Sequence, residues 1–516
     1  MRSLSRAASE WMKRNTQRCS TARVSKRLLF FVLILWLTPV SFAQQQRASA
    51  PPRVKQAAPT SPAEQQYLQG LALQQRGQQA EAIAAFREAL RLQPDYAEAH
   101  SALGYALGEQ NDLAGALAEF EAAIRAKPQL PEAHFRLGVT RWLTGQYQAA
   151  IAPLREAVRL KPKHLEARFY LGRTLQQTGA LHEAIAELRR AVLLGPQAAE
   201  AHSALGAALY ADEDFDGAIE SLRKALALRP NLLEARNQLG LAFIQQRNAD
   251  AAIAEFQQVL RLAPNDRAAQ HNLGLALMQK ADYNAAIATY RQLLALAPDD
   301  AEAHYNLGLA LKYKDDLPAA VAAFRRSLEL QPGLPEAHYS LGVTLLQQGQ
   351  ADAAIAAFRG AIAAKPDFAE AHHTLATALQ QRGELDAAIR AFGEAIRLAP
   401  LSPQVHNTLG TALRQRGELD AARAEFAEAA RLNKLKTDNQ AAIFATNTGI
   451  QKLKEGKLAE AIERFEAAIR LDQNYAPAHY QLGLAWQKSG KRAAARAAFA
   501  RAQELDPRLR APAAKL

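Results

Sequence analysis

Histidine recurs in this sequence at a fixed interval, and imidazole is a common metal ligand and acid–base group in proteins. Neighbouring members of the series mostly lie 34 residues apart, or a multiple of 34. A metal site would need several imidazoles about 2 Å from one ion, whereas equivalent helices of a stack lie roughly 10 Å apart. We therefore expect rings that pack between helices rather than metal ligands. The series comprises His100, His134, His202, His304, His338, His372, His406 and His479.

Other patterns that carry chemistry do not occur. The sequence contains no GxSxG or HExxH motif, no phosphate-binding glycine loop, and no paired carboxylates outside the repeated frame described below. The single cysteine, Cys19, precedes a short apolar run, so a thiolate zinc site or a cysteine nucleophile is not expected in the rest of the chain. We predict a non-enzymatic protein without a cofactor or a metal.

Prolines mark the elements that would position these side chains. Ten of them follow one another at intervals of 34 residues. Lys434 stands where the next proline is due, and the register returns five residues late at Gln473 and Pro507. We infer an insertion at 437–441 between two blocks of repeats, without assigning it a role. The ten are Pro94, Pro128, Pro162, Pro196, Pro230, Pro264, Pro298, Pro332, Pro366 and Pro400.

Each 34-residue unit predicts a helical hairpin. When the recurring proline is numbered position 32, position 8 is glycine in all units but one, position 20 is alanine, and position 24 is a large apolar residue or tyrosine. Positions 4, 7, 8 and 11 form one helical stripe, and positions 20, 24 and 27 form another. A turn near position 15 is often marked by glycine, and the proline ends the second helix.

Stacking is required because a single hairpin cannot cover its own apolar faces. The sequence therefore predicts an all-α solenoid of about thirteen hairpins. Eleven lie in 63–436 and two in 442–509, followed by a tail at 510–516.

This pattern resembles the tetratricopeptide repeat family, over about 63–509. The resemblance implies a right-handed superhelix that binds peptides or proteins on its concave face. Octets such as AEAHYNLG, 301–308, also resemble the repeats of O-linked N-acetylglucosamine transferases. We expect no catalytic domain after the last repeat.

The net charge is +12, but the excess of positive charge lies at the two ends of the chain. Residues 1–43 hold eight basic residues and one acidic residue, and 434–516 hold fifteen basic and eight acidic residues. Residues 44–433 therefore carry about −2, since 12 − 7 − 7 = −2. A basic groove for nucleic acid is not expected there.

The N-terminus has the pattern of a secretory signal peptide. A basic segment precedes LLFFVLILWL, 28–37, and a small-x-small site ends at Ala43. We predict cleavage after Ala43, with an uncleaved membrane anchor as the alternative. Residues 44–62 form a linker rich in Gln, Ala and Pro. The expected location is the bacterial periplasm or the exterior.

Candidate binding residues lie on the stripe of the first helix that stacking leaves free, at positions 2, 5, 6, 9, 12 and 13. Aromatic residues and arginine gather there in units 2–5, which is typical of an interaction hot spot, although Phe135 and Phe169 could equally pack against neighbouring hairpins. Two asparagines farther on resemble the ladder with which the transferase repeats grip a peptide backbone, and a solvated polar face is the alternative. The candidates are Tyr105, Arg136, Trp142, Tyr170, Arg173, Tyr210, Asn272 and Asn306.

Together these features predict a scaffold that binds an extended peptide or a partner protein in its groove. Two alternatives stay open. One is a periplasmic assembly factor for exopolysaccharide export or pilus biogenesis. The other is the recognition subunit of a separate glycosyltransferase, which would need a cytosolic protein.

Overall fold

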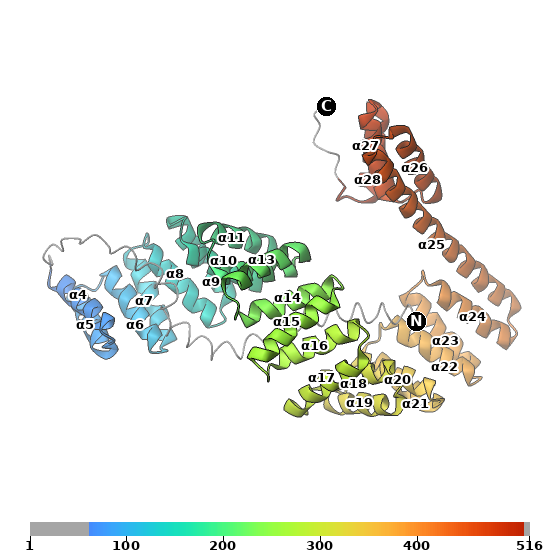
Figure 1. The fold of residues 1–516 in the computed structure, drawn as a ribbon, viewed down its shortest axis with the longest axis horizontal. Helices are drawn as coiled ribbons and strands as arrows, with labels where there is room; N and C mark the ends of the chain where they lie inside the picture. Colours follow the sequence, from blue (N-terminus) through green and yellow to red (C-terminus); the bar gives the residue numbers. More distant parts are fainter. Residues whose placement is uncertain (1–60, 510–516) are drawn as a thin grey trace. The chain divides into compact units, whose positions relative to one another are not determined.

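The computed structural model describes residues 61–509, in which 25 α-helices are the regular elements. The fold is the predicted all-α repeat architecture (Figure 1). The expected signal peptide at 1–43, nearly all of the linker at 44–62 and the tail at 510–516 lie outside the described residues. Within 61–509 no helix is both long and apolar enough to cross a membrane.

The chain divides into two compact units, the first ending at Leu296 and the second beginning at Ala297. Each unit is a stack of antiparallel hairpins, numbered here 1–13 along the chain. The first unit contains α4 (Pro62–Gln75), α5 (Gln79–Leu92), α6 (Ala97–Glu109), α7 (Leu113–Ala126), α8 (Pro131–Leu143), α9 (Tyr147–Leu160), α10 (Leu165–Gln177), α11 (Leu181–Leu194), α12 (Ala199–Ala211), α13 (Phe215–Leu228), α14 (Leu233–Gln245), α15 (Ala249–Leu262), α16 (Arg267–Gln279) and α17 (Tyr283–Leu296). The second contains α18 (Ala301–Tyr313), α19 (Leu317–Leu330), α20 (Pro335–Gln347), α21 (Ala351–Ala364), α22 (Ala369–Gln381), α23 (Leu385–Leu398), α24 (Pro403–Arg416), α25 (Leu419–Lys454), α26 (Leu458–Leu471), α27 (Ala476–Lys488) and α28 (Arg492–Leu505).

Glycine at position 8 lets the two helices of a hairpin approach closely. A Cβ added to Gly308 would lie 2.6 Å from Cε1 of Phe324, the position-24 residue of the same hairpin. The ring of Phe324 is fully buried, as is Ala320 at position 20. Hairpin 10 has Ala376 at position 8 and still buries Phe392 completely, so one methyl group can be accommodated there. The predicted packing frame is confirmed.

The turn inside each hairpin needs a left-handed backbone at position 15. Gly77, Gly145, Gly349 and Gly383 have φ between +75° and +82°, as the sequence predicts. Five hairpins place a residue with a side chain in this conformation, which costs free energy because the Cβ crowds the following carbonyl group. These residues are Asn111, Glu213, Arg247, Ala281 and Asp315.

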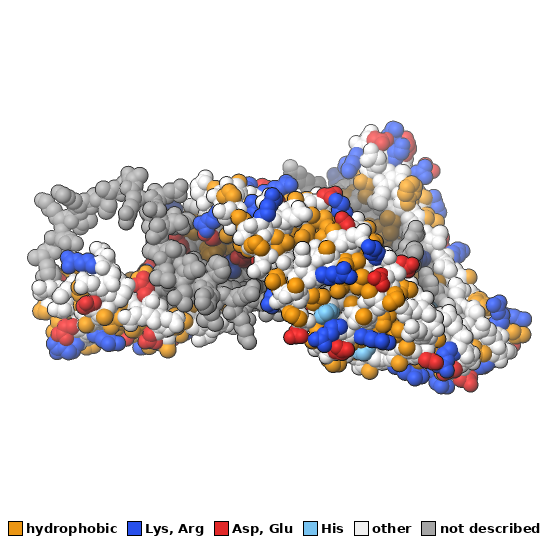
Figure 2. Space-filling model, turned by 60° about the horizontal axis from the view of Figure 1, so that its bottom comes forward, with side chains coloured by type: hydrophobic (Ala, Val, Ile, Leu, Met, Phe, Trp, Pro, Cys, Tyr) orange, Lys and Arg blue, Asp and Glu red, His pale blue; other side chains and the backbone are white. Residues whose placement is uncertain are grey.

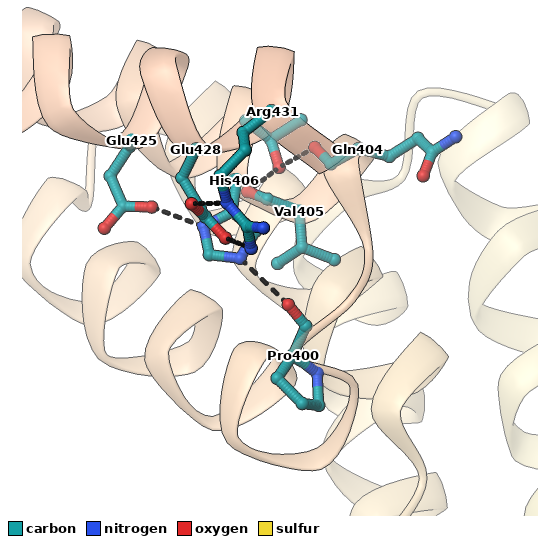
Figure 3. Close-up of polar contacts among 8 residues, drawn as sticks. Pro400, Gln404, Val405, His406, Glu425, Glu428 and Arg431 are labelled. Carbon is teal, nitrogen blue, oxygen red and sulfur yellow. Dashed lines mark hydrogen bonds and ion pairs between the residues drawn. The ribbon is translucent and has the colours of Figure 1, made fainter. Parts of the chain in front are cut away.

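A histidine at position 4 connects its hairpin to the loop before it. Nε2 of His338 lies 2.9 Å from the carbonyl oxygen of Pro332, the position-32 residue of the preceding hairpin. The same contact recurs at His406 and Pro400, at 3.2 Å (Figure 3). Arginine replaces histidine in two hairpins and makes the same bond, from Nε of Arg168 to the oxygen of Pro162, at 2.8 Å. The expected packing role therefore includes a hydrogen bond to a backbone carbonyl, which the sequence reading did not identify.

Helix α25 runs through the inserted segment 437–441 without a break. Its 36 residues form both the second helix of hairpin 11 and the first helix of hairpin 12 (Figure 1). Lys434 occupies the position at which proline ends the other second helices, so the backbone hydrogen-bonding pattern can continue. Ala445 stands at position 4 of hairpin 12, where no loop carbonyl needs a partner.

Candidate functional site

The first helices of successive hairpins contact one another within each unit, so they line the inner side of each stack. Examples are α8 with α10 and α12 with α14 in the first unit, and α20 with α22 in the second. The stripe that the sequence leaves free for binding lies on these helices. The structure shows which of its side chains project and which are already engaged.

Tyr105 and Arg136 form a layered pair across neighbouring first helices. The guanidinium carbon of Arg136 lies 4.2 Å from the centroid of the Tyr105 ring, within the range of a cation–π interaction. Arg136 also forms an ion pair with Glu132 at 2.7 Å, one turn earlier on α8. Burial raises the pKa of Tyr105 to about 12, so its hydroxyl is neutral at physiological pH.

Trp142 on α8 and Tyr170 and Arg173 on α10 form a second cluster. The rings of Trp142 and Tyr170 meet edge to face with centroids 5.5 Å apart, and the guanidinium carbon of Arg173 lies 5.7 Å from the Trp142 ring. Trp142 is only 8 % exposed and belongs to the core between hairpins 3 and 4. The expectation that packing makes no demand on this position is wrong for Trp142, because the wide indole bridges two adjacent first helices.

Phe135 and Phe169 take the packing alternative that the sequence left open. The Phe135 ring lies 6.0 Å from Tyr170 and the Phe169 ring 5.2 Å from it, measured between centroids. Both side chains pack against core clusters of the first unit. Both rings therefore pack against Tyr170 from within the stack.

Arg173 and Tyr210 extend this surface toward hairpin 6. A guanidinium nitrogen of Arg173 lies 4.0 Å from a carboxylate oxygen of Glu234, two hairpins along the stack. The hydroxyl oxygen of Tyr210 accepts a hydrogen bond from the side-chain amide of Gln245 at 3.4 Å. The structure thus brings together five of the six predicted N-terminal residues in two neighbouring clusters, with Tyr210 beside them on α12.

The two asparagines of the proposed ladder are buried in different units. Asn272 is 7 % exposed on α16 of the first unit, and Asn306 is 2 % exposed on α18 of the second. Both side chains are therefore largely covered by their neighbours. Their role as binding residues is not tested by the structure.

Two threonines at position 6 instead contact the first helix of the preceding hairpin. The Tyr339 hydroxyl lies 3.4 Å from Oγ1 of Thr374, and Nε2 of His373 lies 3.1 Å from Oγ1 of Thr408. Each contact joins position 5 of one hairpin to position 6 of the next. The sequence analysis did not predict this pairing, although the polar residues that recur at positions 5 and 6 of successive hairpins could have indicated it.

His164 was also missed, because it lies outside the repeated histidine series. It precedes α10, is 7 % exposed, and stacks against Phe135 with ring centroids 4.7 Å apart. Its ring lies between two carboxylates, with Nδ1 3.1 Å from Glu166 and Nε2 3.8 Å from Glu132. The carboxylates of Glu132 and Glu166 raise the pKa of His164 to about 9. A cationic ring therefore ties α8 to α10 beneath the aromatic cluster.

Charges of both signs are interspersed on the molecular face that Figure 2 shows. Among the residues described, no group of three or more His, Cys, Asp or Glu side chains is arranged to hold a metal ion.

Profiles described as tetratricopeptide repeat or TPR repeat match most of the described chain. The matched ranges are 70–111, 102–164, 142–208, 204–267, 237–301, 271–335, 305–367, 345–407, 451–490 and 476–509. The chain belongs to the tetratricopeptide repeat family. The stretch between 407 and 451, which no profile covers, contains the part of α25 that joins two hairpins of this repeat protein.

Comparison of this tetratricopeptide repeat chain with curated proteins gave no match. Solved structures similar to it include YrrB, a TPR protein with an unusual peptide-binding site, at 21 % identity, with 36 % of this chain and 95 % of that chain covered and a TM-score of 0.32. The APC/C hetero-tetramer Cut9-Hcn1 matches at 15 % identity, covering 87 % of this chain and 94 % of that chain, with a TM-score of 0.35. MamA from Desulfovibrio magneticus RS-1 matches at 24 % identity, covering 33 % of this chain and 96 % of that chain, with a TM-score of 0.32. At these scores the likeness identifies no binding partner for this chain.

Proposed function

We propose that this protein is a non-enzymatic scaffold that binds an extended peptide or a partner protein on the inner face of hairpins 2–5. The observation that carries the proposal is the pair of layered clusters, Arg136 on Tyr105 and Arg173 on Trp142. Arginine and aromatic side chains that are held in place by their neighbours contribute most to protein interfaces, because little side-chain entropy is lost when a partner binds.

The weak ion pairing of Arg173 supports a binding role. Arg173 is only loosely paired with Glu234 at 4.0 Å, so a carboxylate or a backbone carbonyl of a ligand can compete for it. Its side chain is 19 % exposed, which leaves one edge accessible on the inner face.

We further propose that the scaffold acts in the bacterial envelope. The support is the basic and apolar pattern of 1–43, with its small-x-small site at Ala43. N-terminal sequencing of the protein purified from its source cells tests this part. A mature chain that starts after Ala43 supports export, and an intact Met1 in a cytosolic fraction contradicts it.

The binding proposal is tested by cross-linking and pull-down from envelope extracts. The double variant Arg136→Ala/Arg173→Ala removes both cations and leaves the buried Trp142 in place. The matched control is Arg155→Ala/Arg189→Ala, which changes the charge equally on the exposed side of the second helices α9 and α11. We expect the parent and the control to recover the same partner and the double variant to lose it. Equal recovery by all three would exclude this face, and recovery of no partner by the parent would count against the scaffold.

A further inference from the structure

Neighbouring hairpins pack through matching positions, as the last two hairpins of the second unit show. Position 3 of one hairpin packs against positions 27 and 28 of the hairpin before it, as Ala478 does in one cluster with Ala468 and Ile469. Position 3 is alanine and fully buried at Ala337, Ala371 and Ala478. A small residue at position 3 is thus matched by a large one at position 28.

This pairing is not made within the chain between hairpins 11 and 12. Phe444 stands at position 3 of hairpin 12 and is 75 % exposed, whereas Ala337, Ala371 and Ala478 at that position are fully buried. On hairpin 11, Leu419 at the start of α25 is 53 % exposed, and Phe426 at position 24 is only half-buried. In the second unit the other phenylalanines at position 24 between stacked hairpins, Phe324, Phe358, Phe392 and Phe465, are fully buried. Two stacking faces are therefore left uncovered.

The side chains on the uncovered face of hairpin 11 and on that of hairpin 12 are complementary in size. Position 28 carries isoleucine at Ile362, Ile396 and Ile469, but alanine at Ala430 on the open face of hairpin 11. The large residue has moved to position 3, as Phe444. Exchanging large and small residues between facing positions conserves volume, which packed interfaces tolerate well. A solvated end would need neither the exposed Phe444 nor this exchange.

One chain cannot bring the two faces together. Ala430 and Phe444 lie on the single helix α25, 14 residues apart, which corresponds to about 21 Å at 1.5 Å per residue. The sequence between Leu419 and Phe444 contains neither glycine nor proline, so nothing in it bends the helix.

We propose that a second copy of the chain covers these faces, with hairpin 11 of each copy seated on hairpin 12 of the other. The result is a reciprocal, two-fold dimer in which the repeat stack continues from one chain into its partner. Arg423 lies at position 21 of the hairpin 11 face, and its charge is compensated by Asp420 at 3.1 Å. The alternative is that hairpin 11 ends its stack as a solvated cap, because Arg496 likewise stands at position 21 of the last hairpin.

Sedimentation equilibrium of the full chain distinguishes these states. We expect a dimer for the parent, and we expect Phe444→Glu to raise the dimer dissociation constant roughly 30-fold or more, as for loss of an interface hot spot. The control is Leu435→Glu, because Leu435 is 49 % exposed and projects from the opposite side of α25. Both substitutions are at exposed sites, so neither should change the helix content. A monomeric parent, or equal weakening by both variants, would overturn the proposal.

A disulfide tests the predicted pairing directly. In a Cys19→Ser background, which removes the single native thiol, the variant Ala430→Cys/Phe444→Cys carries two cysteines. A disulfide needs Cα atoms within about 7 Å, so on one straight helix these two can join only between chains. We expect a reducible dimer on oxidation, and each single-cysteine variant serves as a control. A double variant that stays monomeric, with both thiols free, would contradict the proposed register.

Discussion

Nδ1 of His406 lies 2.6 Å from a carboxylate oxygen of Glu425, while Nε2 of the same ring bonds the carbonyl oxygen of Pro400 (Figure 3). The histidine thus joins the second helix of its own hairpin to the loop that ends the preceding one. The same pair of partners recurs with arginine, where Arg236 bonds Glu255 at 2.8 Å and the oxygen of Pro230 at 3.1 Å.

Two substitutions of His406 distinguish the contribution of its ring packing to stability from the contribution of its hydrogen bonds. We expect His406→Ala to lower the free energy of unfolding by about 1–2 kcal/mol, because the Pro400 carbonyl group and the Glu425 carboxylate both lose a polar partner. His406→Arg should retain most of the stability, since arginine makes both bonds in hairpin 6. The measurement is the urea midpoint. Equal losses in both variants would show that the ring's packing matters and its hydrogen bonds do not.

Gly308 should not accept a branched side chain. Even a Cβ would lie 2.6 Å from the Phe324 ring, so Gly308→Val forces the ring and the helix to move, at a cost of about 1–3 kcal/mol. The control is Gly393→Ala on α23, where no heavy atom lies within 4 Å of an added Cβ. That change should raise stability by up to about 1 kcal/mol through helix propensity. Thermal melts followed by circular dichroism measure both, and a neutral Gly308→Val would refute the packing frame.

Arg247 offers a stabilising substitution. It adopts φ 59° at the turn of hairpin 6, where Gly145 adopts φ 75° in hairpin 3. We expect Arg247→Gly to increase stability by about 1 kcal/mol, because the left-handed conformation strains any side chain with a Cβ. Arg247→Ala keeps the Cβ and should bring no such gain. An equal thermal midpoint for the two variants would show that the turn stores no strain.

His164 links stability to pH through its two carboxylate neighbours. Since the carboxylates of Glu132 and Glu166 raise its pKa from 6.5 to about 9 in the folded chain, its stabilisation is fully present below pH 6.5. It is lost as the pH rises toward 9, because the folded protein then releases the proton that it holds more tightly than the unfolded chain does. His164→Asn should flatten the decline of the thermal midpoint between pH 6.5 and 9. An unchanged slope would remove His164 as its source.

Lys434 determines whether α25 is one helix or two. Lys434→Pro restores the residue that ends the other second helices and should cost about 3 kcal/mol of local helix stability. We expect new proteolytic cleavage between 430 and 441 under native conditions. Lys434→Ala keeps the backbone N–H and should remain resistant. Resistance of both variants would mean that contacts of the flanking hairpins, rather than the helix itself, protect this segment.

Most of the fold could be predicted from the sequence because its determinants are local and repeated. Glycine at position 8 faces the large residue at position 24, and each is specified by helical periodicity within one hairpin, as for Gly308 and Phe324. The glycines at position 15 likewise specify their own turns. The candidate binding residues could be assigned to the first helices for the same reason, but the spacing did not show that Trp142 is buried, and their binding role stays a prediction.

What the sequence alone determined is therefore the repeat unit, its two helices and the face that each turns to its neighbour. Only the tertiary structure decided which inner-face side chains engage one another: Trp142 is buried beneath Tyr170 and Arg173, and His338 reaches the carbonyl of Pro332. It also decided that α25 continues through residues 437–441. The physical reason is that these contacts join different hairpins, and their geometry depends on how neighbouring helices pack, which no spacing within one unit specifies.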